Sequence, residues 1–180
     1  MKNIDMKYDE NAIESLYQQN LITARQQLAS LPVAEGREPN IKGLNGWVYE
    51  QTIHYCLCQE LQSHGLTPKV DEQVTLFGRA KIDLMVDRVA IEIKALGSFG
   101  NDTKKYNKYR AKVEEKGWRY FYLTRSETYN PYRSEVVSTF GKERAFFLDT
   151  KGDWARFVKE VERYCNESKS QGNVIDIGDE

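Results

Sequence analysis

Two carboxylates and a lysine interrupt a stretch that otherwise resembles an ordinary β-hairpin, KIDLMVDRVAIEIK, residues 81–94. Apolar residues alternate with other residues on both sides of a two-residue turn at Asp87-Arg88, as in strands that bury one face. In that register Asp83 faces Glu92 directly, and Lys94 lies on the same face, one pleat repeat from Glu92. The spacing therefore gathers two acids and one base on one side of a sheet.

Two like charges about 5 Å apart across a strand pair destabilise a sheet, so the pair is either solvated or has a cation between its members. Carboxylate oxygens are the ligands that Mg²⁺ prefers, and a bound Mg²⁺ neutralises a phosphate and activates water. The alternative is a solvated polar face with a salt bridge among Asp83, Glu92 and Lys94. Relief of the repulsion predicts that Asp83→Ala keeps or raises the stability of the metal-free protein.

Hydrophobic periodicity and Gly or Pro breaks predict the elements that hold these residues. Helices are expected over 10–30, about 47–62, 102–117 and 134–141 and from Asp153 onward, and strands over 69–78, the two arms of the hairpin, 118–124 and 145–149. The helix at 47–62 is expected to be largely buried. A helix between two strands favours a parallel crossover beside the hairpin.

The chain is therefore predicted to be an α/β protein with a mixed central sheet flanked by helices. Residues 1–167 form one domain, with a core over about 43–124, an N-terminal helix and a C-terminal helical extension. Residues 168–180 are polar and acidic and are expected to be a disordered tail.

The core order α-β-β-β-α-β, with an Asp on one strand and Glu-x-Lys on the next, resembles the PD-(D/E)XK nuclease superfamily, whose fold is restriction-endonuclease-like. The resemblance covers about 43–124 and departs at the Pro of the motif, which is Ile82 here. Five other acid-x-Lys triplets occur in the chain, but only Glu92-Ile93-Lys94 has an Asp placed across a hairpin.

The resemblance implies a set of site residues. Asp83, Glu92 and the carbonyl of Ile93 would bind Mg²⁺, for which Mn²⁺ can substitute, and Lys94 would hold or deprotonate the attacking water. Glu50, on the first core helix, would add a further acidic group at the site. His54 lies four residues after Glu50, which favours a pair on the helix surface.

The function that this resemblance implies is a metal-dependent DNA endonuclease, a small restriction-type enzyme working as a homodimer because one site cuts one strand. Two alternatives remain open. One is a structure-specific or repair nuclease that acts on branched DNA. The other is a non-catalytic DNA-binding subunit of a nuclease assembly.

Cations and aromatic residues outside the hairpin are candidate DNA contacts. A cationic stripe recurs every four residues on the 102–117 helix, at Lys104, Lys108 and Lys112, where a solvated face and phosphate contacts give the same pattern. The segment TRSETYNPYRSE supplies Arg125 and Arg133 for phosphates or guanine edges, and Tyr129 and Tyr132 for stacking.

Composition excludes several classes of protein. With 40% hydrophobic and 29% charged residues and no long apolar run, the 180-residue chain fits a soluble globular protein without a membrane span or signal peptide, so a cytoplasmic location is expected. Its net charge of −1 means that DNA must meet a local basic patch. Three cysteines without a CxxC pair and two histidines indicate neither zinc nor a disulfide framework.

Overall fold

A computed structural model of the chain describes residues 6–30, 43–95, 99, 102–125 and 132–172, of which 168–172 are described by their backbone alone. These residues form a single α/β domain with a five-stranded mixed, open sheet and five helices. The expectations of an α/β class, a single domain and a mixed central sheet are confirmed.

The sheet has the strand order β1-β2-β3-β4-β5, with the strands at Val70–Phe77, Ala80–Val86, Val89–Lys94, Arg119–Thr124 and Ala145–Phe147. The first three strands form antiparallel pairs, whereas β3, β4 and β5 run parallel. Helix α3 (Thr103–Glu115) connects β3 to β4, which confirms the predicted parallel crossover. All three strand ends at Lys94, Thr124 and Phe147 therefore lie at one edge of the sheet.

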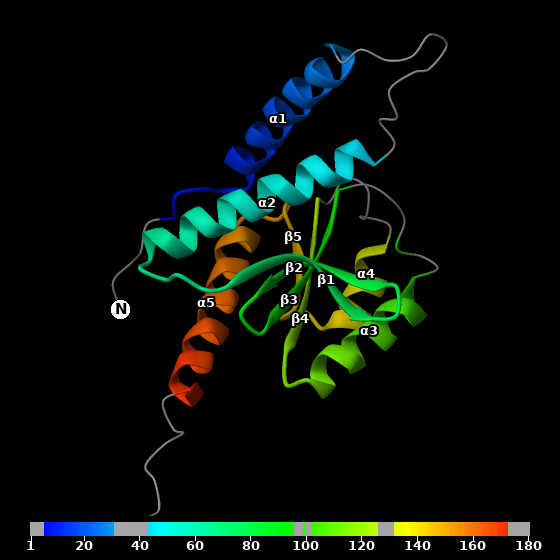
Figure 1. Cartoon of the computed structure of the whole chain (residues 1–180), viewed down its shortest axis with the longest axis vertical. Coiled ribbons are helices and arrows are strands. Elements are labelled where there is room, and N and C mark those ends of the chain that lie inside the picture. Colours follow the sequence, from blue (N-terminus) through cyan, green and yellow to red (C-terminus); the bar gives the residue numbers. More distant parts are fainter. Residues whose placement is uncertain (1–5, 31–42, 96–98, 100–101, 126–131, 173–180) are drawn as a thin grey trace, which may run out of the picture.

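Helices cover both faces of this sheet (Figure 1). On one face lie α2 (Leu44–Ser63) and α5 (Asp153–Gly172), with α1 (Glu10–Ser30) packed against α2. On the other face lie α3 and α4 (Arg133–Phe140). The arrangement is a three-layer sandwich in which α2, α3, α4 and α5 bury apolar side chains against the central sheet, while α1 packs on α2.

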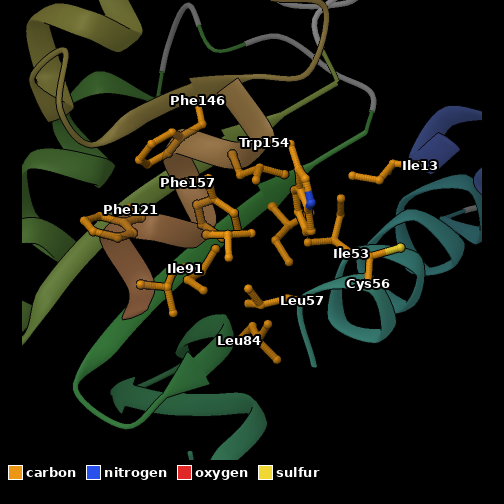
Figure 2. Packing of buried hydrophobic residues seen from close by; sticks show 14 of the residues in the cluster. Ile13, Ile53, Cys56, Leu57, Leu84, Ile91, Phe121, Phe146, Trp154 and Phe157 are labelled. Atoms are coloured by element: carbon orange, nitrogen blue, oxygen red, sulfur yellow. The ribbon is translucent and has the colours of Figure 1, made fainter. Parts of the chain in front are cut away.

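The first hydrophobic core lies between the sheet and the layer of α1, α2 and α5. Figure 2 shows Trp154 and Phe157 of α5 packed beside Ile53 and Leu57 of α2, above Ile91 of the sheet. This core fixes the position of α2 over the hairpin, because the buried side chains of α2 recur at helical spacing.

The second core lies on the opposite face, where the sequence pattern had indicated a polar surface. Met85 and Ala90 pair across the hairpin and are buried beneath α3 and α4, together with Tyr120 and Phe140. Glu92 is only 3% exposed. The expected one-sided hairpin is therefore wrong, because the crossover helix covers its second face.

Helix α2 is largely buried, as expected, although Trp47 and Tyr55 are 57% and 52% exposed. One element prediction needs correction. Helix α5 continues to Gly172 and includes the first five residues of the predicted tail, because a polar helix end can extend through its backbone hydrogen bonds alone. Residues 173–180 lie outside the described part of the chain.

Candidate functional site

The alternation of side chains along β2 breaks at Asp83. Leu84 belongs to the first core and Ile82 to the second, although residues two apart on a regular strand share a face. On the neighbouring strand β1, Gln73 stands opposite this break and has a positive φ of 50°. Such a backbone is uncommon for a residue other than glycine, and it marks a local irregularity of the sheet at Asp83.

The carboxylate of Asp83 lies where β2 and β3 part. The regular pairing of these strands has the predicted register and ends at Leu84 opposite Ile91. Beyond it, the backbone N–H of Ile93 donates to Asp83 Oδ2 at 2.8 Å. A side-chain oxygen thus continues the hydrogen bonding between the strands and fixes the carboxylate in place.

The ammonium group of Lys94 contacts three oxygen groups at this point. Its Nζ is 2.5 Å from Glu92 Oε1, 3.0 Å from Asp83 Oδ2 and 3.1 Å from the carbonyl oxygen of Ile93. The side chain is 21% exposed. A cation therefore lies between the two carboxylates, as the sequence requires of a pair that is not solvated.

Two tyrosines hold the carboxylate of Glu92 from the α3 side. Tyr106 of α3 donates to Oε1 at 3.3 Å, and Tyr120 of β4 donates to Oε2 at 3.2 Å. Burial raises the pKa of Glu92, Lys94 opposes that rise, and Asp83 adds to it, so that the pKa lies above the usual range. Without a cation the protein would thus favour protonation of this group.

The pKa of Lys94 is also raised, but for an ammonium this favours the charged form. Burial alone would lower the pKa of its ammonium, but the charges of Glu92 and Asp83 outweigh burial and raise it. The lysine is therefore fully charged near neutral pH, and the cluster of Asp83, Glu92 and Lys94 favours the presence of positive charge.

Glu50 approaches the same position from α2, on the other face of the sheet. It lines a cleft with Asp83 and Ile93, and its carboxylate accepts a hydrogen bond from Gln73 Nε2 at 3.3 Å. Burial, followed by the charge of Asp83, raises the pKa of Glu50 to about 7. The predicted acidic residue of the first core helix thus shares the cleft with Asp83.

The three oxygen groups around Lys94 Nζ are the same three that the family resemblance implies as metal ligands. The ammonium acts as a stand-in ion, and two carboxylates with a backbone carbonyl form the hard oxygen set that Mg²⁺ binds. No group of three or more His, Cys, Asp or Glu side chains with metal-binding placement occurs among the described residues, and the proposed set has only two such side chains. The residues present therefore fit one hard cation.

The candidate DNA contacts differ in their surroundings. Lys104, Lys108 and Lys112 are exposed on α3, although Lys108 lies over the Phe77 ring and Lys112 pairs with Glu115 at 2.6 Å. An exposed stripe on α3 is compatible with both readings of that pattern.

The two arginines are already engaged within the chain. Arg125 donates twice to Glu14 of α1, at 2.7 and 2.6 Å, and Arg133 pairs with Asp149 at 3.0 Å. Tyr132 is half-buried against the second core, and Tyr129 lies outside the described residues. Phosphate binding by Arg125 would require it to exchange partners.

Sequence reasoning missed four residues near the site. Tyr106 and Tyr120 fall within the expected helix 102–117 and strand 118–124, and their hydroxyls become relevant only when α3 and β4 are placed beside Glu92. Gln73 read as a strand residue but hydrogen-bonds Glu50. Lys105 lies over the Tyr106 ring at 4.7 Å, and its charge acts on Glu92, whereas the sequence pattern had drawn attention to its neighbour Lys104.

His54 does not pair with Glu50 as expected. Its Nδ1 contacts Glu72 of β1 instead, and both groups line the same cleft as Glu50. The imidazole therefore belongs to the wall of the cleft.

A comparison of the chain with models of known families, with curated proteins and with solved structures finds no match. No helix in the described ranges is long and apolar enough to cross a membrane.

Proposed function

We propose that the protein is a metal-dependent DNA endonuclease with its site at Asp83, Glu92 and Lys94. The observation that carries the proposal is the convergence of Asp83, Glu92 and the Ile93 carbonyl on one cation, the ammonium of Lys94. Carboxylate and carbonyl oxygens that bind a cation near the carboxyl ends of parallel strands are suited to phosphate chemistry. The order α2-β1-β2-β3-α3-β4 also supports the restriction-endonuclease-like topology that the sequence resemblance implies.

Each residue has a defined part in this proposal. Asp83, Glu92 and the Ile93 carbonyl would hold Mg²⁺ or Mn²⁺, which supplies charge neutralisation at phosphate and an acidified water when bound. Lys94 would yield its present position to the metal, and its flexible stem would let the ammonium reach a phosphate oxygen or the attacking water. Glu50 would face the same water from α2.

Two substrate classes are compatible with these groups. A restriction-type enzyme would cut both strands of a duplex as a homodimer, since each chain has one such site. A nuclease for branched or damaged DNA would use the same groups at an irregular substrate. We expect either to act in the cytoplasm.

A non-catalytic DNA-binding role is the third reading. The ion pairs of Arg125 with Glu14 and of Arg133 with Asp149 do not favour it, because a binding module relies on cations that are available for phosphates. The Lys94 cluster has no evident use in such a module.

The test is incubation of linear, supercoiled and branched DNA with Mg²⁺, Mn²⁺ or EDTA, followed by mapping of the ends. We expect cleavage with either metal, none in EDTA, and none by Asp83→Asn. Cleavage by that variant at the wild-type rate would refute the site. DNA binding by the wild type without cleavage in any divalent metal would support the binding-module reading instead.

A further inference from the structure

Trp47 is a large aromatic side chain that belongs to neither hydrophobic core. It lies in the first turns of α2 and is 57% exposed. Ile22 and Tyr55 are also more than half exposed. Trp47 lines the cleft that contains Glu50 and Asp83, whereas Ile22 and Tyr55 do not line it. An indole face therefore stands open beside the proposed catalytic groups, although exposing it to water costs free energy that burial would recover.

Most of the other side chains that line the cleft are polar, and several of them contact one another. Glu72 Oε1 accepts a hydrogen bond from Gln51 Nε2 at 3.1 Å and contacts His54 Nδ1, while Gln73 reaches Glu50. A carboxylate has two oxygens, and each amide has both a donor and an acceptor end, so these groups retain hydrogen-bonding capacity for a ligand. The cleft combines one aromatic face with polar groups that could meet the edge of a planar ring.

The charge of the cleft decides which part of a nucleic acid can enter it. Glu50, Glu72 and Asp83 supply three carboxyl groups to its lining. Ionised carboxylates repel a phosphate wherever the proposed metal does not offset their charge, whereas a nucleobase is neutral and can stack on an indole.

We propose that Trp47 is a stacking platform for an unpaired nucleobase next to the phosphate held at Asp83 and Lys94. Bases inside a duplex are stacked on both faces, so only an unpaired or flipped-out base can offer a free face to Trp47. This inference rests on the proposed nuclease function, and it selects DNA with an unpaired base at the cleavage site.

The test compares the binding of three DNA probes in EDTA, where the proposed mechanism allows no cleavage. The probes are a short single-stranded oligodeoxynucleotide, the same backbone with abasic sites throughout, and a fully paired duplex. We expect the wild type to bind the base-bearing single strand about tenfold or more tightly than the abasic strand. The tryptophan emission should be quenched by the base-bearing strand alone.

Variants test whether the indole of Trp47 causes the preference for the base-bearing strand. Trp47→Ala should bind the base-bearing strand as weakly as the abasic one, and Trp47→Phe should retain most of the preference because it keeps an aromatic face. Tyr55→Ala is the matched control, since it removes an exposed aromatic ring from the same helix outside the cleft. It should bind all three probes as the wild type does.

The outcomes separate this inference from the proposed function. A preference for bases that vanishes in Trp47→Ala, in a protein that no divalent metal makes cut DNA, would support the platform and refute the nuclease. Metal-dependent cleavage with unchanged base preference in Trp47→Ala would refute the platform alone. Equal binding of the base-bearing and abasic strands by the wild type would also overturn it. A change from dimer to monomer in Trp47→Ala with unaltered DNA binding would overturn it too, because Trp47 would then be a subunit contact.

Discussion

The ammonium group of Lys94 allows two carboxylates to occupy one largely buried position. Asp83 and Glu92 both lie within 3.0 Å of its Nζ, and Glu92 is 3% exposed. A buried carboxylate without a partner costs several kcal/mol, so the internal cation stabilises the metal-free protein. A divalent ion at this point would replace one cation by another without changing the surrounding oxygens.

The first prediction concerns Asp83 and reverses the expectation from sequence. Asp83→Ala removes the acceptor of the Ile93 N–H and one partner of Lys94. We therefore expect a loss of about 1–3 kcal/mol in the free energy of unfolding without metal. Urea unfolding in EDTA would measure it, with Asp83→Asn as the control because its amide oxygen can still accept from Ile93. An alanine variant as stable as the wild type would show that repulsion dominates.

The second prediction concerns Glu50 and pH. Its pKa rises from an ordinary 4.5 to about 7 in the folded protein, so the folded state retains a proton that the unfolded chain releases between these values. Stability contributed by this group is therefore lost as pH rises through that window. Glu50→Gln cannot ionise, and it should gain about 1 kcal/mol on the wild type between pH 4.5 and 8, after allowance for solvent screening.

Unfolding free energies of the wild type and Glu50→Gln across this pH range would check the second prediction. Glu135→Gln, at an exposed position of α4, is the control for the loss of a surface carboxyl group and should differ from the wild type by less than about 0.5 kcal/mol. A constant difference between Glu50→Gln and the wild type would contradict the burial of Glu50 beside Asp83.

At the scale of elements, α3 and β4 contact and orient Glu92, a residue of the β2–β3 hairpin. The hydroxyls of Tyr106 and Tyr120 reach Glu92 from these two elements, and both rings lie within the second core. The orientation of Glu92 therefore depends on the packing of the crossover helix against the sheet.

The third prediction tests this support. Tyr106→Phe and Tyr120→Phe each remove a donor to a buried carboxylate, and each should cost about 1–3 kcal/mol of stability and lower any cleavage rate. Tyr49→Phe is the matched control, because its buried hydroxyl has no hydrogen-bond partner among the described residues. Thermal unfolding of the three variants would check it. Equal stability of all three would mean that the two hydroxyls do not hold Glu92.

The elements themselves could be predicted from the sequence, because periodicity and turn residues are local. The hairpin register followed from Asp87-Arg88 alone, and the crossover helix implied parallel pairing. The break at Asp83 could not be predicted, since it depends on a side-chain oxygen bonding Ile93 on the next strand. Nor could the second buried face, because covering Glu92 requires α3 to fold back over the sheet.

The candidate site residues could likewise be predicted only where their contacts are local or follow from the packing of a predicted element. Asp83, Glu92 and Lys94 meet because they are neighbours on one hairpin, and Glu50 joins them because α2 packs over it. The partners of Arg125 could not be foreseen, since Glu14 lies 111 residues away in the chain.

At the scale of the whole molecule, Glu60 joins the N-terminal segment to the helical layer. Its carboxylate is 0% exposed and accepts hydrogen bonds from the backbone N–H of Lys7 and Tyr8, at 3.1 and 2.7 Å. The indole N–H of Trp154 on α5 is 3.5 Å from the same group. One carboxylate thus connects the segment before α1 with α2 and α5.

The fourth prediction follows from this junction. Glu60→Ala leaves two backbone donors without their partner and opens a cavity beside Trp154, so it should destabilise the fold by about 2–4 kcal/mol. Gln59→Ala is the control, because Gln59 makes only an exposed contact with Lys7 among the described residues, and it should cost less than about 0.5 kcal/mol. Chemical unfolding would compare them. Similar losses for both would refute the anchoring role of Glu60.

The fifth and most direct test of the account is a joint measurement of metal binding and cleavage for Lys94→Met. The variant removes the internal cation but none of the three oxygen groups, so Mn²⁺ should bind it at least as tightly as it binds the wild type, measured by calorimetry. Loss of the ammonium should nevertheless slow single-turnover DNA cleavage at least about a hundredfold.

Two controls complete that measurement. Lys159→Met removes an exposed cation of α5 and should retain both metal binding and most of the activity, whereas Asp83→Asn should lose both. The account predicts a Lys94→Met protein that binds metal and fails to cut. A variant that cuts DNA at the wild-type rate, or a wild type and variant that both bind no divalent metal, would contradict it.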